Sequence, residues 1–394
     1  MRTLEPTAAV ARKSTPDKGI ADAFIDQSPA RDYQQITTSN ATTTAAVVSN
    51  PPTLFAELIK RLGSNVWMGS IDTTLTTAWQ ICDGNRLVIN PALLTPALLA
   101  GLTNHGGVFL TVAEKSAEGR TILALLGQRA ILVPGYGYFV TPAGVAPGSL
   151  EYAVLKANVL EAAFQVKSNS PLAQLLAATY LSSLRDDKNA IRVLQTMSPS
   201  DQGRAYCIAA HDETDPALKQ KFIEEAIKSN WKLYISKNSR EKCSGSYGIA
   251  LAYREKSDSD NELKYLKECY YASLTPNPDK QYQYADIIMA RLFSFGRYNE
   301  AKEWYSQVND PSRLVIYRAK LYEIEGDVNN AIFTAGKAPQ TIDNLLYLGS
   351  LYKKTQNTRD AEWTLGRINQ QLSKLPSAEQ ARIKNSADYK KLMQ

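Results

Sequence analysis

The sequence LLYLGSLYKKTQNTRDAEWTLGRI, at residues 345–368, carries the pattern that decides the fold. Its apolar side chains recur at helical spacing on both sides of the polar run KKTQNTRD, which predicts two helices joined by a short turn. The first helix contains Leu348, Gly349 and Tyr352, and Ala361 lies in the second helix. Small residues at Gly349 and Ala361 would let the helices pack closely, with the tyrosine filling the space between them.

The same layout recurs 30 residues earlier, and a third copy precedes that one by the same interval. Repetition at this period is the sequence signature of stacked helical repeats. Gly296 and Gly326 each stand between the two helices of a unit, where a left-handed residue commonly ends a helix. The matching residues are Ala285, Ile288, Met289, Leu292, Ala301, Tyr305 and Val308 in the first unit, Val315, Ala319, Tyr322, Ala331 and Ala335 in the second, and Leu345, Leu348, Gly349, Tyr352, Ala361, Leu365 and Ile368 in the third.

Weaker copies of the unit lie upstream, one around Ala177 and another around Ala250, each with one extra residue in its turn. Between them, residues 203–231 predict a shortened helix pair. The polar, amphipathic end of the chain, residues 377–394, predicts a capping helix, because the last layer of a helical array must face water.

These units resemble tetratricopeptide repeats over about residues 170–375. The resemblance implies that residues 149–394 form an all-α, superhelical solenoid closed by the capping helix. It also implies a protein that binds partner proteins and supplies no chemistry of its own. Because the array is irregular, related helical repeats of the Sel1 and half-a-tetratricopeptide kinds stay open as alternatives.

In tetratricopeptide arrays, the first helix of each pair lines a concave groove on the side turned away from the second helix. The resemblance therefore implies a partner-binding groove here, whose apolar and basic side chains favour a partner segment with acidic residues. The alternative is that its Lys and Arg are ordinary solvated side chains. The Lys and Asn set that clamps a C-terminal carboxylate in some family members is not present. The residues assigned to the groove are Tyr247, Leu251, Arg254, Gln283, Asp286, Phe293, Arg313, Ile316, Lys320, Ile324, Leu346, Ser350, Lys353 and Lys354.

Residues 52–148 have a different texture and resemble no family. Short β-branched and aromatic runs between Gly, Pro and Asn, such as GVFLTVAE and RAILVPGYGYFVTP, predict strands. TLFAELIKRLG and EGRTILALLG predict helices that stop at glycine. We expect a small α/β or α+β domain. Residues 1–51 are rich in Thr, Ala and Ser and predict a disordered tail, with a transit peptide as the competing interpretation.

Composition and charge favour a soluble, cytoplasmic protein. Hydrophobic residues make up 44% and charged residues 21% of the chain, and no apolar run is long enough to span a membrane. The N-terminus lacks the apolar core of a secretory signal. The net charge of +6 is spread without a dense basic run, so we expect no nucleic-acid partner. Cys82, Cys207, Cys243 and Cys269 lack CxxC spacing, and we expect buried free thiols.

The sequence offers few groups for catalysis. Its two histidines, His105 and His211, fall in different predicted domains, which makes a histidine metal site or proton relay hard to build. We expect His105 to be a turn residue. Gly135 and Gly137 lack the spacing of a phosphate loop and are expected to serve a strand turn. We expect no cofactor, no metal and no enzymatic activity.

Two functions stay open at this point. The first is an adaptor or scaffold in a larger assembly, such as a secretion, pilus or regulatory complex. The second is an enzyme or ligand-binding domain at residues 52–148, with the repeats recruiting substrate or partner. A deep polar pocket between the strands would favour the second function, and a flat or exposed apolar surface would favour the first.

Overall fold

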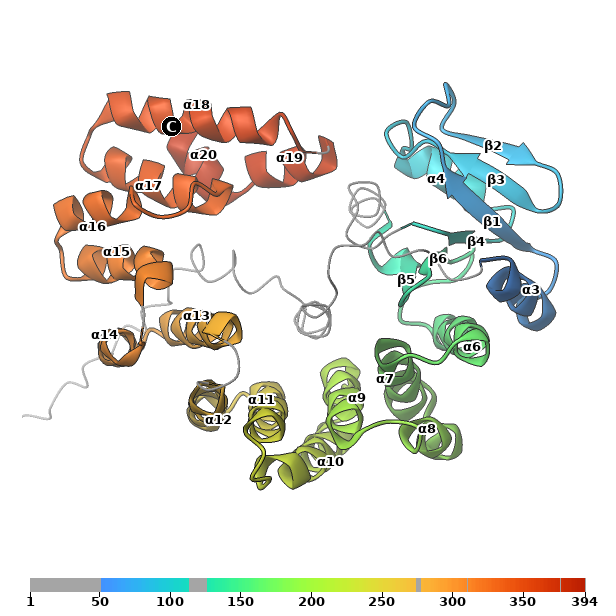
Figure 1. The fold of residues 1–394 in the computed structure, drawn as a ribbon. Helices are drawn as coiled ribbons and strands as arrows, with labels where there is room; N and C mark the ends of the chain where they lie inside the picture. Colours follow the sequence, from blue (N-terminus) through green and yellow to red (C-terminus); the bar gives the residue numbers. More distant parts are fainter. Residues whose placement is uncertain (1–50, 113–125, 274–277, 310, 376, 394) are drawn as a thin grey trace, which may run out of the picture.

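The computed structural model describes residues 51–112, 126–273, 278–309, 311–375 and 377–393 (Figure 1). Within these ranges, an α/β region with a six-stranded mixed sheet is followed by a region made only of helices. The predicted tail and most of the helix predicted at EGRTILALLG lie outside the described ranges.

The sheet has the strand order β2-β3-β1-β4-β6-β5. Strands β3, β1 and β4 run parallel at its centre, while β2 and the β5–β6 hairpin add antiparallel strands at the edges. Gly135 and Gly137 turn the hairpin with positive φ values of 84° and 133°, as predicted, because glycine adopts this backbone without strain. The strands are β1 Val66–Ile71, β2 Trp79–Cys82, β3 Arg86–Ile89, β4 Gly107–Leu110, β5 Ala130–Val133 and β6 Gly137–Val140.

Helices cover both faces of the sheet. On one face, Leu58 of α3 and Leu160 of α6 share a core with Phe109 of β4. On the other face, Leu102 of α4 packs in a second core with Leu110 of the same strand. Helix α6 belongs to the core that continues into the helical region, so it joins the two regions. The helices are α3 Pro51–Leu62, α4 Pro96–Thr103 and α6 Leu150–Val166, with a 3-10 turn at Gly127–Arg129.

After α6, the helices follow one another along an arc (Figure 1). From α7 to α18, the odd-numbered helices lie on the inner side of the arc and the even-numbered helices on its outer side. The first helix of each predicted pair is therefore an inner helix. The helices are α7 Ser170–Ala178, α8 Asp187–Leu194, α9 Pro199–Asp212, α10 Pro216–Tyr234, α11 Ser239–Glu255, α12 Ser259–Ala272, α13 Pro278–Ser294, α14 Tyr298–Gln307, α15 Val315–Ile324, α16 Val328–Ala335, α17 Ile342–Lys354, α18 Thr358–Leu372, α19 Ser377–Lys384 and α20 Ala387–Met393, with a 3-10 turn at Pro311–Leu314 before α15.

The small residues of the repeat lie where helices approach closely. Ala301, Ala331 and Ala361 are all buried, with exposed fractions of 0%, 0% and 1%. A methyl group added at Gly349 would lie 2.9 Å from Leu392 of α20 and 3.4 Å from a side-chain carbon of α18. The predicted role of these positions in close packing is therefore confirmed.

Five of the six described turns from inner to outer helix share one backbone geometry, and the α9–α10 connection is the exception. Gly296 and Gly326 have positive φ values of 68° and 85°, as expected for residues that end a helix. Arg185, Ser257 and Gln356 adopt the same left-handed conformation in the equivalent turns, with φ between 54° and 59°. The turn is thus kept even where the residue is not glycine.

A cap box, here two hydrogen bonds between the N-cap residue and the residue three positions later, follows the left-handed residue in four of these turns. Asp327 accepts a hydrogen bond from the amide of Asn330 at 3.1 Å, and its other oxygen accepts one from the Asn330 side chain at 2.6 Å. Each box satisfies an amide that the start of the outer helix leaves without an intrahelical partner. The other boxes join Asp186 to Asn189, Asp258 to Asn261 and Asn357 to Asp360.

Three sequence predictions need correction in the helical region. The pair predicted as shortened is full-length, because Asp215 caps α10 directly after a tight connection, and α10 has 19 residues. The extra residue predicted in the first turn lies in a π-helical turn, Thr179–Leu184, that extends α7. The single capping helix is divided into α19 and α20, because the hydroxyl of Ser386 accepts from the Tyr389 amide at 3.3 Å and starts a new helix.

Candidate partner-binding surface

Side chains of α13, α15 and α17 form a continuous ladder on the inner side of the arc. The ring of Phe293 lies 5.5 Å from that of Tyr317, and Lys320 Nζ lies 5.6 Å from the ring centres of both Tyr317 and Tyr347. The Tyr347 hydroxyl donates to a Glu323 carboxylate oxygen at 2.8 Å. We call these five residues the inner ladder. Tyr317 is buried and the other four are half-buried, so the ladder is a surface that spans three helix pairs.

The charged groups at the inner ladder are partly desolvated by the surrounding protein. Burial lowers the pKa of the Lys320 ammonium, although the carboxylates of Glu323, Asp286, Asp343 and Asp388 all favour its charged form. Burial also raises the pKa of the Asp286 carboxyl, even though one side of that residue is open to solvent. Desolvation thus disfavours the charged form of both groups.

Replacing Lys320 with Met is expected to raise the thermal unfolding midpoint at pH 7. In the folded protein the pKa of Lys320 is lowered, so its charged form destabilises the fold at pH values below that pKa. This destabilisation disappears as the pH rises above the pKa of Lys320 in the folded protein. Met carries no charge at any pH and keeps most of the side chain's length. The gain of the variant over wild type should therefore shrink between pH 7 and pH 10, as followed by circular dichroism. An equal gain at both pH values would show that the ammonium is well hydrated.

The other predicted groove residues divide by burial. Gln283 is exposed, Ile316 and Lys353 are half-buried, and Ile324 is 46% exposed. The Ser350 hydroxyl donates to the Tyr347 carbonyl at 2.7 Å. Arg313 lies in the 3-10 turn before α15, and its side chain is outside the described part. Two basic residues are ion-paired, Arg254 with Glu262 at 2.8 Å and Lys354 with Glu323.

Three of the predicted groove residues are instead buried in the core, at 1–7% exposure: Tyr247, Leu251 and Leu346.

The sequence pattern missed three members of the inner ladder. Tyr317, Glu323 and Tyr347 were not assigned to the groove, although Tyr317 and Glu323 lie on α15 with Lys320 and Tyr347 lies on the next inner helix, α17. The spacing of Tyr317 and Glu323 was available as a signal, because residues three positions from Lys320 share its helix face. The acidic groups around Lys320 were not evident from sequence, since Asp286 and Asp388 belong to helices far apart in the chain.

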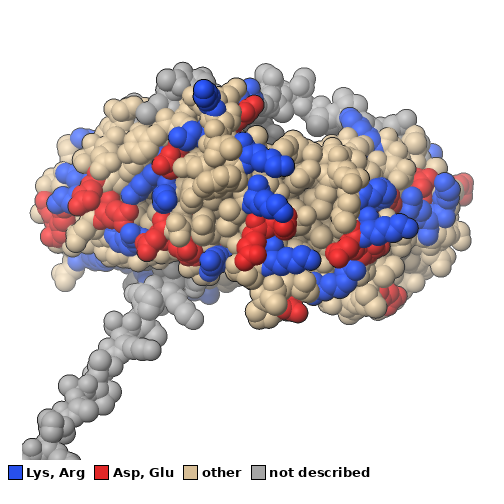
Figure 2. Space-filling model, turned by 90° about the horizontal axis from the view of Figure 1, so that it is seen from below, with Lys and Arg blue, Asp and Glu red and all other residues tan. Residues whose placement is uncertain are grey.

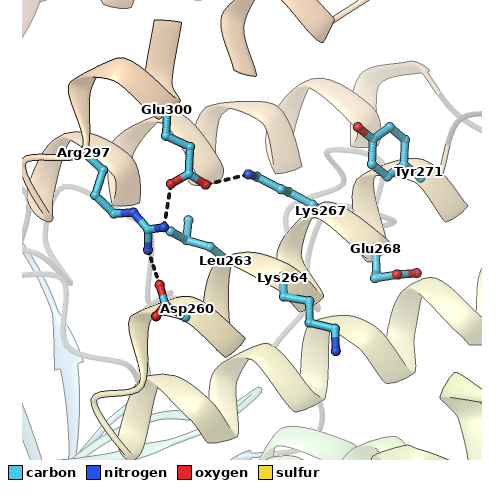
Figure 3. A pocket seen from close by; sticks show the side chains of 8 residues that line it. All are labelled: Asp260, Leu263, Lys264, Lys267, Glu268, Tyr271, Arg297 and Glu300. Carbon is cyan, nitrogen blue, oxygen red and sulfur yellow. Dashed lines mark hydrogen bonds and ion pairs between the residues drawn. The ribbon is translucent and has the colours of Figure 1, made fainter. Parts of the chain in front are cut away.

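A shallow hollow of about 400 Å³ lies on the outer side, between α12 and α14 (Figure 3). Its charged side chains neutralise one another: Arg297 pairs with Asp260 at 2.5 Å and with Glu300 at 2.6 Å, and Lys267 pairs with Glu300 at 2.7 Å. Figure 2 shows the same mixture of basic and acidic side chains across the face of the molecule seen from below. The charged side chains of this hollow therefore offer no field of one sign that would attract nucleic acid.

The α/β region has a hollow of about 380 Å³, lined in part by Val66, His105, Gly107 and Phe139. It lies where the parallel strands β1 and β4 begin, whereas open α/β sheets bind ligands at the carboxyl ends of their strands. His105 is an exposed turn residue, as predicted, and its carbonyl accepts from Trp67 Nε1 at 3.1 Å. The hollow therefore lies at the opposite end of the parallel strands from the usual ligand site of such sheets.

The described residues contain no group of three or more His, Cys, Asp or Glu that could hold a metal ion. The four cysteines form no disulfide bond with one another, and three are buried as predicted, but Cys82 is exposed at the edge of the sheet. His211 pairs with Glu255 at 3.2 Å, and this hydrogen bond raises the pKa of the imidazole. No helix in the described part is long and apolar enough to cross a membrane.

No family model matches this chain, and no curated protein is significantly similar to it.

Proposed function

We propose that this protein is a non-catalytic adaptor whose inner helices hold a segment of a partner protein within a larger assembly. The inner ladder is the observation that carries this proposal. Three consecutive helix pairs contribute to one accessible surface, and burial there disfavours the charged forms of Lys320 and Asp286. Groups that break the local rules of stability in this way are typical of functional surfaces. A tetratricopeptide-like superhelix is the finer form of the same proposal.

The partner segment is proposed to anchor through apolar or aromatic side chains. Each of Arg254, Lys320 and Lys354 already faces a carboxylate of this chain, so the inner surface is not an open basic field. Phe293 and Tyr347, both half-buried, offer ring surface instead. Aromatic residues are common hot spots of protein interfaces. The acidic partner predicted from the sequence stays a prediction for this face.

Site-specific photo-cross-linking in cells tests the proposal. A benzophenone side chain is placed at Gln283, which is exposed on the ladder side of α13, or at Glu303, which is exposed on the outer helix α14. Position 283 should capture a partner at a single segment, and adding Tyr347→Ala should reduce that product. The matched position 303 should not capture it.

Two outcomes would contradict an adaptor that works through the inner ladder. One is the same cross-linked products from positions 283 and 303. The other is no product at either position together with a small molecule that copurifies with the protein, which would favour a ligand-binding role of residues 52–148 instead.

A further inference from the structure

Two aromatic side chains are exposed on the outer face of the last helix pairs. Phe333 of α16 is 64% exposed and Trp363 of α18 is 56% exposed. They are 30 residues apart and follow the buried residues Ala331 and Ala361 by two positions, so they occupy the same place in successive repeats. The two rings belong to no core cluster of the described residues.

A cation lies over each ring. Lys337 Nζ is 3.8 Å from the centre of the Phe333 ring, and Arg367 Cζ is 4.8 Å from that of Trp363. In both cases the cation follows the aromatic residue by four positions: Arg367 lies one turn further along α18, and Lys337 lies in the turn directly after α16. The residues four positions before the rings extend the two rows. We call Asn329, Phe333, Lys337, Arg359, Trp363 and Arg367 the outer stripes.

The outer stripes are not required by the repeat itself. The equivalent positions in the preceding unit hold Glu303 and Gln307, which are both exposed and polar. A helix pair of this kind therefore packs without an aromatic residue at this place. Large exposed rings lower solubility, and grouped together they mark interaction surfaces.

The charge of the outer stripes is one-sided. They contain three cations, whereas Glu362 is the one exposed carboxylate on α16 or α18. None of the three cations takes part in an ion pair between described residues, unlike Lys354 on the inner side or Arg297 in the outer hollow. This surface therefore offers unneutralised basic groups beside aromatic rings.

We propose that the outer stripes dock a partner protein through a segment in which acidic side chains alternate with apolar ones. Carboxylates would pair with Lys337, Arg359 and Arg367, and apolar side chains would cover Phe333 and Trp363. Trp and Arg are the residue types that contribute most to such interfaces. Nucleic acid is the less favoured occupant, because tracking a phosphate backbone requires a longer basic groove than three cations provide. This surface is separate from the inner ladder and does not depend on the adaptor proposal.

Fluorescence anisotropy with labelled peptides tests this proposal at physiological salt. The probe is a peptide of repeated Asp-Glu-Leu-Phe units, compared with a Lys-Lys-Leu-Phe peptide and a thymidine oligonucleotide of similar length. The full-length protein should bind the acidic peptide and neither of the other two probes. Phe333→Ser with Trp363→Ser should weaken binding by at least about tenfold, and Lys337→Glu with Arg367→Glu should weaken it by a similar factor.

The control is Glu303→Ser with Gln307→Ser, which changes the equivalent positions one repeat earlier and should leave binding unchanged. Because all substituted side chains are on the surface, circular dichroism should show the same helical content in every variant. The proposal is overturned if the acidic peptide does not bind, if both double variants bind it as wild type does, or if the oligonucleotide binds better. Gln283→Trp, on the inner side, should leave binding of the acidic peptide unchanged. That result would show that the peptide binds the outer stripes and not the inner ladder.

Discussion

Replacing Glu262 with Gln is expected to destabilise the centre of the array by about 3–5 kcal/mol. The Glu262 carboxylate is 2% exposed and lies 2.8 Å from nitrogen atoms of both Arg254 and Arg291. The three side chains come from α11, α12 and α13, so one buried charge joins two successive helix pairs. Gln has nearly the same shape but no charge, and it leaves two guanidinium groups without their counterion in a poorly hydrated place.

Hydrogen exchange measured at pH 7 would locate this loss. Amides of α11, α12 and α13 should exchange faster, and the midpoint of chemical unfolding should fall. Glu303→Gln serves as the control, because Glu303 is exposed and has no ion pair within the described part of the chain; its effect should stay within about 0.5 kcal/mol. If the two variants behave alike, the carboxylate of Glu262 is solvated and does not join the pairs.

Replacing Gly245 with Ala is expected to destabilise the protein by about 1–3 kcal/mol, although Ala is the better helix former. An added methyl group would lie 2.3 Å from the Tyr234 amide nitrogen and 2.8 Å from the Asn230 carbonyl oxygen. Both atoms belong to the backbone of α10, which cannot yield as a flexible side chain would. Helices α10 and α11 would have to move apart, and their shared core would lose contact.

Gly366→Ala in α18 is the matched control for this overpacking. It is also a glycine inside a helix, but a methyl group there would meet no atom within 4 Å. The substitution should stabilise the protein by about 0.5–1 kcal/mol, because Ala loses less backbone entropy on folding. The two substitutions should thus have opposite signs in chemical unfolding. A stabilising effect of both would mean that α10 and α11 lie further apart than described here.

The order of helices could be predicted from sequence where close packing restricts the choice of residue. Close packing required small residues at Ala301, Ala331 and Ala361. The helices before the turns had to end at Gly296 and Gly326, so the sequence predicted the register of the last pairs. The left-handed turns at Arg185, Ser257 and Gln356 were not readable, because these residue types rarely adopt positive φ. The box of Asp or Asn with a partner three residues later was the better signal for those turns.

The candidate surface was less predictable than the fold. The resemblance to tetratricopeptide repeats assigned Tyr247 and Leu251 to the inner side, but it could not show that neighbouring helices bury them. Glu262 has the sequence character of a solvated helix residue, and its burial depends on arginines from two other helices. Contacts between helices decided both cases, and a single helix does not encode such contacts.

The recurring turn between inner and outer helices has a consequence for how this protein could change its length. The turns that precede Asp327 and Asn357 each end in a left-handed residue, Gly326 or Gln356, and an equivalent cap box follows each, 30 residues apart. Duplicating or deleting residues 327–356 would therefore join equivalent ends and leave each remaining turn intact. Gene duplication could thus lengthen the inner surface in whole steps of one helix pair. The length of that surface would then depend on the number of repeats.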